Sequence, residues 1–350
     1  MIIRYILFPF SLLYGVITAI RNFLFNRNIM KGVQFDIPII SIGNLTAGGT
    51  GKSPHTEFLI RLLKDQYRIA TLSRGYGRSV SGFKIVSSES TVRDCGDEPL
   101  QFKTKFPGIE VAVDKDRVNG VIELLKHDAE LNCIVLDDAY QHRGIIPSHS
   151  ILLTEYSRPF YKDWMLPTGD LREYPMGKNR ANTVIVTKCP PDLSTTDQND
   201  IKRRLSLNSN ISVYFSAFKY GAINAINSDD KFESLADLKD INIVLVTGIA
   251  NPKPLTEQLN RDGINFEHVK FADHHRFNDK DIVKIRNLFD TFDGEKIILT
   301  TEKDAQRLKS IDSISTLPFF YLQIEVVFQN DEQSFKTEIE EHVRNYKSDS

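Results

Sequence analysis

The sequence predicts an α/β protein built on a mostly parallel sheet of the P-loop NTPase type, with a second, smaller α/β domain and an N-terminal membrane-associated helix. Short β-branched apolar runs alternate with amphipathic stretches, which is typical of βαβ units. A glycine-rich turn joins one of these runs to a helical pattern, and the chain begins with an apolar, basic segment. The 350 residues, of which 41% are hydrophobic, are enough for about two domains with their own cores.

The overall charge and the cysteines exclude several classes of function. A formal net charge of -2 provides no general basic field, so a nucleic-acid partner is not expected. The three cysteines, Cys95, Cys133 and Cys189, are odd in number and widely spaced, which predicts neither a disulfide framework nor a cysteine metal site. A reducing cytoplasm fits this pattern, and no obligate protein partner is expected.

The first predicted element is a helix over residues 1–30. The chain is apolar from Tyr5 to Ile20 with few interruptions, and no acidic residue precedes Asp36. This stretch is shorter than the roughly 20 apolar residues that span a bilayer, which favours an interfacial or shallowly inserted helix. A buried core helix and a signal peptide are the alternatives, although no cleavage site is evident for the latter. The basic residues that would meet anionic headgroups are Arg4, Arg21, Arg27 and Lys31.

Three parts are predicted after this helix: a P-loop kinase domain over 31–210, a two-stranded linker over 211–228, and a C-terminal α/β domain over 229–345. The linker sequence suggests two extended runs around a turn at Tyr220-Gly221, as in a hairpin. The expected helices include Thr56–Leu63 and Arg117–Leu125. The expected strands are Ile39–Ile42, Ile69–Leu72, Val111–Val113, Ile134–Leu136, Ile151–Leu153, Val184–Val186, Ile243–Val246, Phe266–Phe271, Ile297–Leu299 and Phe319–Ile324.

The stretch "NLTAGGTGKSPHTEFLI", residues 44–60, predicts a phosphate-binding loop. Its second half, Gly51-Lys52-Ser53, matches the motif G-x-x-x-x-G-K-[ST], whereas Thr46 replaces the first glycine. The glycines allow backbone N–H groups to approach phosphate oxygens, Lys52 would reach the β- and γ-phosphates, and the Ser53 hydroxyl would bind Mg²⁺. The predicted nucleotide-binding residues are Thr46, Ala47, Gly48, Gly49, Thr50, Gly51, Lys52 and Ser53.

A second strand end supports nucleotide binding. The apolar run "CIVLDDAYQHR" ends in Asp137 and Asp138, about 85 residues after the loop. Carboxylates at such a strand end commonly hold Mg²⁺ opposite a phosphate loop, so both are candidate metal residues together with Ser53. Ala47 occupies the position of the signature lysine in dimerisation-dependent partitioning ATPases, which argues against that class.

Several further stretches complete a recognisable order: "LSRGYGR" (72–78), "GDEP" (96–99), "LPTGDLRE" (166–173), "FADHHRF" (271–277) and "TTEKDAQR" (300–307). With the loop and the double aspartate, they resemble the tetraacyldisaccharide 4'-kinase (lipid A 4'-kinase) family from the N-terminal helix to about residue 307. The resemblance implies an enzyme that uses ATP and Mg²⁺ to phosphorylate the 4'-hydroxyl of tetraacyldisaccharide 1-phosphate. It also implies action at the cytoplasmic face of the bacterial inner membrane, with the active site in a cleft between two domains.

The resemblance also assigns roles to individual residues. Asp97, in "GDEP", corresponds to the general base for the sugar hydroxyl, and His274, in "FADHH", to the histidine that pairs with it. Because the two lie on different predicted domains, domain closure is expected to assemble them, with Lys52 as the third catalytic residue. The candidate substrate contacts are Arg74, Gln141, His142 and Arg172, with a structural ion pair as the alternative for each arginine.

Two other classes of function compete with the kinase. A membrane-associated P-loop GTPase or ATPase switch without lipid-kinase activity would also need the loop and the aspartates. Its guanine motif N/T-K-x-D is only superficially matched by "TEKD", where the spacing is wrong. A membrane-tethered scaffold leaves both motifs unexplained.

Overall fold

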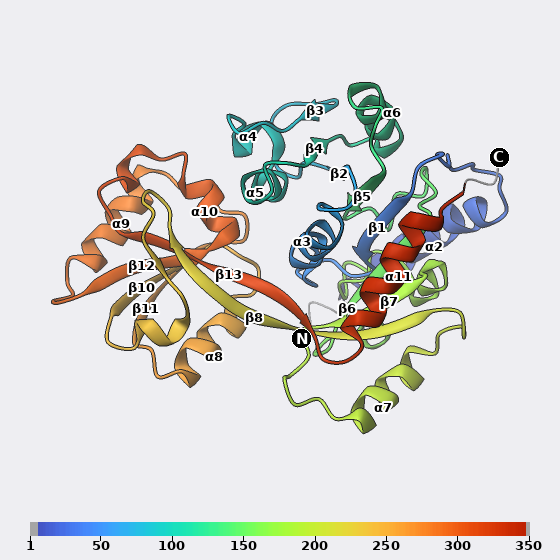
Figure 1. The fold of residues 1–350 in the computed structure, drawn as a ribbon. Coiled ribbons are helices and arrows are strands. Elements are labelled where there is room, and N and C mark those ends of the chain that lie inside the picture. The colour runs from blue at the N-terminus through green and yellow to red at the C-terminus, as the bar shows by residue number, and fades with distance from the viewer. Residues whose placement is uncertain (1–5, 348–350) are drawn as a thin grey trace.

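The computed structural model describes residues 6–347 and consists of two lobes joined by two long strands (Figure 1). Residues 1–5, the start of the predicted membrane helix, lie outside the described residues. Within 6–347, the strands form one continuous hydrogen-bonded path, in the order β11-β10-β12-β13-β8-β7-β6-β1-β5-β2-β4-β3, with β9 paired to β8. The predicted α/β class and its mostly parallel sheet are confirmed.

The first lobe contains the parallel sheet that was predicted from the β-branched runs. Each predicted strand of residues 31–210 is present, and only the short edge strand β3 runs antiparallel. The strands pair through fully buried residues, so both faces of the sheet are covered. The strands are β1 (Ile39–Asn44), β2 (Ile69–Ser73), β3 (Lys84–Ile85), β4 (Glu110–Val113), β5 (Cys133–Asp137), β6 (His149–Glu155) and β7 (Thr183–Thr187).

Helices cover this sheet on both sides. One core joins α3, α5 and the C-terminal helix α11 to one face, and other clusters place α6 and α7 against the opposite face. The helical segments of this lobe are α3 (Lys52–Leu63), α4 (Val92–Cys95), α5 (Asp97–Lys105), α6 (Arg117–His127) and α7 (Thr195–Leu205), with 3₁₀ turns at Phe160–Lys162 and Pro175–Arg180.

The second lobe is a smaller α/β unit. Its strands β10, β11, β12 and β13 are parallel, and β8 closes the edge in the antiparallel direction. Helix α8 packs on one face and helices α9 and α10 pack on the other. The elements are β9 (Lys231–Phe232), β10 (Asn242–Thr247), α8 (Lys253–Arg261), β11 (Phe266–Lys270), α9 (Asp279–Phe289), β12 (Lys296–Thr301), α10 (Glu302–Leu308) and β13 (Phe319–Phe328), with 3₁₀ turns at Leu235–Leu238 and Asp312–Ile314.

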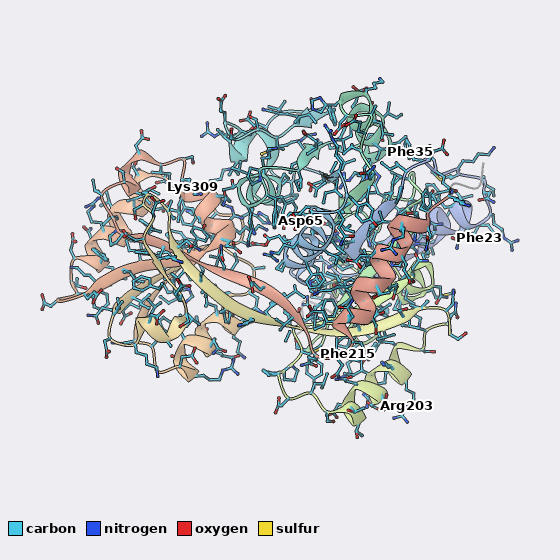
Figure 2. The ribbon with its side chains drawn as sticks, in the orientation of Figure 1. Phe23, Phe35, Asp65, Arg203, Phe215 and Lys309 are labelled. Atoms are coloured by element: carbon cyan, nitrogen blue, oxygen red, sulfur yellow. The ribbon has the colours of Figure 1, made fainter. Side chains whose placement is uncertain are left out.

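The connection between the lobes corrects the predicted hairpin. Residues Ser212–Ala225 form one continuous strand, β8, with no turn at Tyr220-Gly221. Its start pairs with β7 as far as Phe215, and from Ser216 onward it pairs with β13, which returns from the second lobe. Figure 2 shows Phe215 where the two long strands reach the first lobe. A shift of register opposite this glycine indicates a β-bulge, so the residue that suggested a turn marks a strand irregularity instead.

The C-terminal helix corrects the predicted end of the second domain. Helix α11 (Glu332–Asn345) packs on the first lobe, where Phe335, Ile339 and Val343 join the core beneath α3. Figure 1 shows α11 lying against the first lobe rather than the second. The apolar spacing of its residues predicted a helix but gave no sign of which lobe it would cover.

The N-terminal helix α2 (Phe8–Asn26) is docked on one side only. Its buried residues are small, Ser11, Gly15 and Thr18, and this allows a close approach to the first lobe. A Cβ atom at Gly15 would stand 2.3 Å from the hydroxyl of Tyr174. Among the described residues, α2 is the one helix long and apolar enough to cross a membrane. Only 17% of its apolar stretch is buried, so α2 is not a helix of the protein core.

Candidate active site

The predicted phosphate loop connects β1 to α3 at the carboxyl edge of the first sheet. Helix α3 begins at Lys52, and its N-cap, Gly51, has a φ of 88°, a left-handed conformation that favours glycine. A Cβ atom at this position would also stand 2.6 Å from the ring of Phe218 on β8. No side chain caps the helix, so its first N–H groups are left for an anion.

Contacts from neighbouring strands hold the loop in place. The hydroxyl of Thr187 donates to the carbonyl of Thr50 at 2.8 Å, and the ammonium of Lys188 donates to the carbonyl of Gly49 at 2.5 Å. On the other side, the amide of Ala47 donates to the carbonyl of Asp170 at 2.6 Å. Because two of these bonds use loop carbonyls and the third uses the amide of Ala47, they leave the glycine N–H groups as groups that can face phosphate.

His55 connects the loop to the strand that joins the lobes. It is fully buried, and this burial lowers its pKa to about 4, so the ring is neutral near pH 7. Its Nδ1 lies 2.7 Å from the carbonyl of Gly51, and its Nε2 lies 2.9 Å from the hydroxyl of Ser216. Since a carbonyl only accepts, Nδ1 carries the proton and Nε2 accepts from Ser216. The loop is thereby fixed to β8 at the point where β8 leaves the first sheet.

Lys52 points at the second aspartate of the strand-end pair. Its ammonium lies 3.7 Å from Asp138 and 3.4 Å from the side-chain oxygen of Asn44. Arg172 binds the same carboxylate at 3.0 Å. Burial opposes ionisation of Asp138, but the charges of Lys52 and Arg172 outweigh it and lower the pKa. This carboxylate is therefore ionised and held beside the phosphate loop.

Asp137 and Ser53 fit a Mg²⁺ ion. Burial, followed by the nearby charges of Glu98 and Asp138, raises the pKa of Asp137 to about 7. Such crowding of carboxylates is relieved when a cation binds between them. Ser53 donates to Glu98 at 2.8 Å, which places its hydroxyl in the same cluster. Residues 6–347 contain no group of three His, Cys, Asp or Glu arranged as a closed metal cage, which suits an ion held partly by phosphates and water.

Asp97 and His274 meet across the two lobes. Asp97 begins α5 and is buried, whereas His274 lies in the loop after β11, with its Nδ1 atom 3.2 Å from the Asp97 carboxylate. Burial alone would raise the pKa of Asp97, but the hydrogen bond with His274 and the charges of Lys303 and Arg307 hold that pKa well below its usual range. The predicted pair is thus adjacent, and its carboxylate is ionised.

The residue after Asp97 connects this pair to the phosphate loop. Glu98 accepts from Ser53 on α3 and also lies 3.3 Å from the ammonium of Lys303 on α10. The acidic pair Asp97-Glu98 therefore lies between the nucleotide loop and the second lobe.

Comparison with known proteins identifies the family. The model of the family described as tetraacyldisaccharide-1-P 4'-kinase matches residues 3–344. The chain belongs to the tetraacyldisaccharide 4'-kinase family. The tetraacyldisaccharide 4'-kinase of Flavobacterium johnsoniae is 46% identical, over 98% of each chain, and that of Bacteroides thetaiotaomicron is 44% identical, over 97% of this chain and 93% of the relative.

A solved structure supports the same family. LpxK from Aquifex aeolicus in complex with ATP matches with a TM-score of 0.77 and 26% identity, over 97% of this chain and 99% of that one. The predicted family is confirmed, as is the prediction of a kinase rather than a P-loop switch.

The four candidate substrate residues of this family member differ in their surroundings. Arg172 forms the ion pair with Asp138 described above, and Gln141 donates to the carbonyl of Asn44 at 2.8 Å and to Glu173 at 3.0 Å. Both are committed to internal contacts. His142 is half-buried, and burial together with the charge of Arg117 lowers its pKa. Arg74 is exposed and has no hydrogen-bond or ion-pair partner among residues 6–347, so its guanidinium is available for an anionic ligand.

Sequence reasoning assigned no role to three contributors to the site of this kinase. Glu98, Lys303 and Arg307 all contact the Asp97 region, and each lies inside a motif that was recognised for other residues. Glu98 could have been found from the sequence, since it directly follows Asp97, the predicted base. The arginine and the lysine were not identifiable, because their contacts depend on how α10 meets α5.

Proposed function

We propose that this chain transfers the γ-phosphoryl group of ATP to the 4'-hydroxyl of tetraacyldisaccharide 1-phosphate, the step that leads to the lipid A precursor. One observation carries the proposal beyond family membership: the buried Asp97 lies beside His274, and its neighbour Glu98 touches Ser53 of the phosphate loop. A carboxylate in this place can accept a hydrogen bond from a sugar hydroxyl and aim it at a nucleotide in the loop.

The proposed roles follow from chemistry and position. The loop amides and Lys52 would bind and orient the β- and γ-phosphates, and Ser53, Asp137 and Asp138 would hold Mg²⁺. When bound, Mg²⁺ neutralises charge on the phosphate oxygens. Asp97 orients the acceptor hydroxyl and takes its proton. Its low pKa suits this work, because phosphoryl transfer has a loose transition state in which orientation matters more than early deprotonation.

We also propose that the enzyme works at a membrane surface, on the cytoplasmic side where ATP is present. The outward face of α2 is apolar, and Figure 2 shows Phe23 at the rim of the molecule. The exposed apolar side chains of α2, together with Ile6 just before it, are Ile6, Phe8, Phe10, Leu12, Leu13, Val16, Ile17, Ile20 and Phe23. Each side chain that leaves water for lipid contributes about 1 kcal/mol. Basic residues at its end, such as Arg27, would lie near anionic headgroups.

The inward face of α2 is attached to the active-site edge. The hydroxyl of Tyr14 donates to the carbonyl of Arg172 at 3.0 Å, Arg21 donates to the carbonyl of Gln141 at 3.1 Å, and Asn22 donates to Glu173 at 2.8 Å. A bilayer that holds α2 would therefore present acylated sugar beside the segment that carries Arg172. This supports a lipid acceptor over a soluble one.

Transfer of ³²P from ATP to the disaccharide lipid in detergent micelles tests the activity. We expect label in the lipid that depends on both Mg²⁺ and the acceptor. Phosphate release without labelled lipid would contradict the proposal and favour an ATPase.

Membrane binding is tested with substitutions on the outward face only, because deleting α2 would also remove its contacts with Arg172. We expect the double variant Leu13→Glu/Ile17→Glu to bind anionic phospholipid vesicles at least about tenfold more weakly in flotation assays. Val283→Glu on α9, at a similarly exposed apolar residue, is the control and should bind as the unmodified chain does. Equal binding by all three proteins would disprove the membrane role of α2.

A further inference from the structure

Arg307 occupies the centre of the contact between the two lobes. It lies on α10, is buried, and directs its N–H groups at acceptors in both lobes. Its Nε atom donates to Asp97 Oδ2 at 3.1 Å, and one Nη2 hydrogen is directed at the same oxygen. Nη1 donates to the carbonyl of Gly248 at 3.0 Å and to Asp304 at 2.9 Å, and Nη2 also lies 3.1 Å from Nδ1 of His274.

The second lobe holds this guanidinium rigidly. Asp304 is fully buried, and its other oxygen accepts from the amide of Gly248 at 2.9 Å and from the hydroxyl of Thr301 at 2.8 Å. Thr301 in turn caps α10. Arg307 is therefore fixed by its own lobe before it reaches Asp97, and it needs no help from the first lobe to keep its orientation.

The first lobe, in contrast, provides the Asp97 carboxylate with a single hydrogen bond among the described residues. Its Oδ1 atom accepts from the amide of Glu98 at 3.0 Å, whereas the partners of Oδ2 within residues 6–347, namely His274, Lys303 and Arg307, all come from the second lobe. Two of these contacts with Oδ2 are weaker than that of Arg307, because the ammonium of Lys303 lies 3.9 Å away and the side chain of His274 is one-third exposed. The direction of the carboxylate is thus set across the interface, mainly by the planar guanidinium.

We propose that Arg307 is the positioning residue for Asp97: it fixes Oδ2 when the lobes meet and leaves the second lone pair of Oδ1 for the acceptor hydroxyl. The inference rests on the proposed function, because it concerns the same transfer. Arg307 does not touch the nucleotide loop, so its contribution falls on the transfer step and not on ATP binding. A misplacement of about 1 Å in a catalytic group can slow a reaction about 100-fold.

The test compares Arg307→Met, Arg307→Lys and a matched arginine variant. Methionine keeps the stem of the side chain, and Asp304 retains two hydrogen bonds without the arginine, so the fold is expected to survive. For Arg307→Met we expect kcat for lipid phosphorylation to fall about 100-fold, with KM for ATP within about threefold of the unmodified value. Arg307→Lys keeps the positive charge but offers only one point of contact. We expect its kcat to be about tenfold higher than that of Arg307→Met.

Arg276→Met is the control. Arg276 also crosses between the lobes, donating to the carbonyl of Gly77 at 3.2 Å, but in the described part of the chain it is not among the partners of Asp97. We expect its kcat within about threefold of the unmodified enzyme. An equal loss in Arg276→Met and Arg307→Met would show that lobe contact in general, not Arg307, sets the rate, and would overturn the inference.

A double-mutant cycle separates positioning from a structural effect. If Arg307 acts through Asp97, adding Arg307→Met to Asp97→Asn should slow residual transfer by less than about twofold, whereas independent effects would multiply. A multiplied loss, or an unchanged kcat in Arg307→Met, overturns the inference. Should Arg307→Met fail to fold, an unchanged kcat in Arg307→Lys would overturn it equally. An unmodified enzyme without transfer would overturn the proposed function instead.

Discussion

The two halves of the site are built in different ways. The nucleotide half, residues 46–53, is held by β1, α3 and β7 of the first lobe and by the start of β8. The acceptor half depends on the second lobe, because Asp97 is oriented by His274 and Arg307, which lie 177 and 210 residues further along the chain. The first half is therefore complete within one lobe, and the second exists only while the lobes touch.

This difference suggests a division of labour. A nucleotide loop within one lobe can bind ATP in any arrangement of the lobes, whereas a base assembled across the interface is active only after closure. Such an order protects ATP from hydrolysis before the acceptor arrives. Substitutions in the acceptor half should accordingly change kcat alone, and substitutions in the nucleotide half should change ATP binding as well.

The largest effect is expected at Asp97. Asp97→Asn keeps the size of the side chain and removes the negative charge, so the hydroxyl loses its proton acceptor. We expect kcat to fall by about 10²- to 10⁴-fold, with the Kd for ATP within about twofold. Single-turnover ³²P transfer and equilibrium binding of ATP measure the two quantities. Asp273→Asn, beside the other nitrogen of His274 at 4.0 Å, is the control and should retain most activity.

A smaller effect, shared between binding and transfer, is expected at Lys52. Lys52→Met removes the cation that we propose faces the phosphates, and we expect kcat/KM for ATP to fall about 100-fold with a clear rise in KM. Lys188→Met, which frees the carbonyl of Gly49 without touching phosphate, should change KM only a few-fold. A loss confined to kcat in Lys52→Met would contradict the division between the two halves.

The sequence predicted the strand, turn and helix of the nucleotide half because the information for these elements is local. The β-branched run, the glycines and the helical pattern occupy residues 39–63 in order, and each is required by the geometry of the loop. The acidic strand end could be predicted in the same way, since Asp137 and Asp138 come at the end of an apolar run. The positions of Asp97 and His274 came from resemblance to a family, and their mutual distance of 3.2 Å agrees with that expectation.

The interface between the lobes was not predictable from the sequence. Tyr220-Gly221 has the composition of a turn, but its partner strand, β13, lies about 100 residues away, and this pairing keeps the chain extended. In the sequence, nothing distinguishes Arg307 from other arginines at the end of a short helix. Its contact with Asp97 arises only because α10 packs on α5. Helix α11 is apolar on one face, but only the return path of β13 brings that face to the first lobe. In each case the deciding contact is distant along the chain.

His55 offers a way to disturb the nucleotide half without touching phosphate. His55→Ala would remove the bond to Gly51 and the bond to Ser216, and we expect the free energy of unfolding to fall by about 2 kcal/mol. Because the loop carbonyl would lose its support, KM for ATP should rise up to about tenfold while kcat changes less. Urea unfolding and steady-state kinetics measure both. An effect on kcat alone would show that the contact with β8 serves lobe closure rather than the loop.

The smallest effect is expected at the amino end of β6, far from both halves, where α11 is attached to the first lobe. Burial, and then the neighbouring His342, lower the pKa of His149 to about 4, although the charge of Glu338 at 3.5 Å acts in the opposite direction. The unfolded chain, with a histidine pKa near 6.5, therefore binds more protons than the folded chain between pH 6.5 and 4. The free energy of unfolding should fall as the pH is lowered through this window, by on the order of 1 kcal/mol from this group.

The variant His149→Gln tests this sign directly. Its denaturation midpoint in urea should change less between pH 7 and pH 5 than that of the unmodified chain, since the buried group no longer gains a proton on unfolding. His127→Gln, at a half-exposed histidine, should leave the pH dependence as it is. Activity at pH 7.5 should be the same in all three proteins, because His149 lies at the opposite edge of the sheet from the phosphate loop. A stability that rises on acidification would show that the charge of Glu338, rather than burial, controls this histidine.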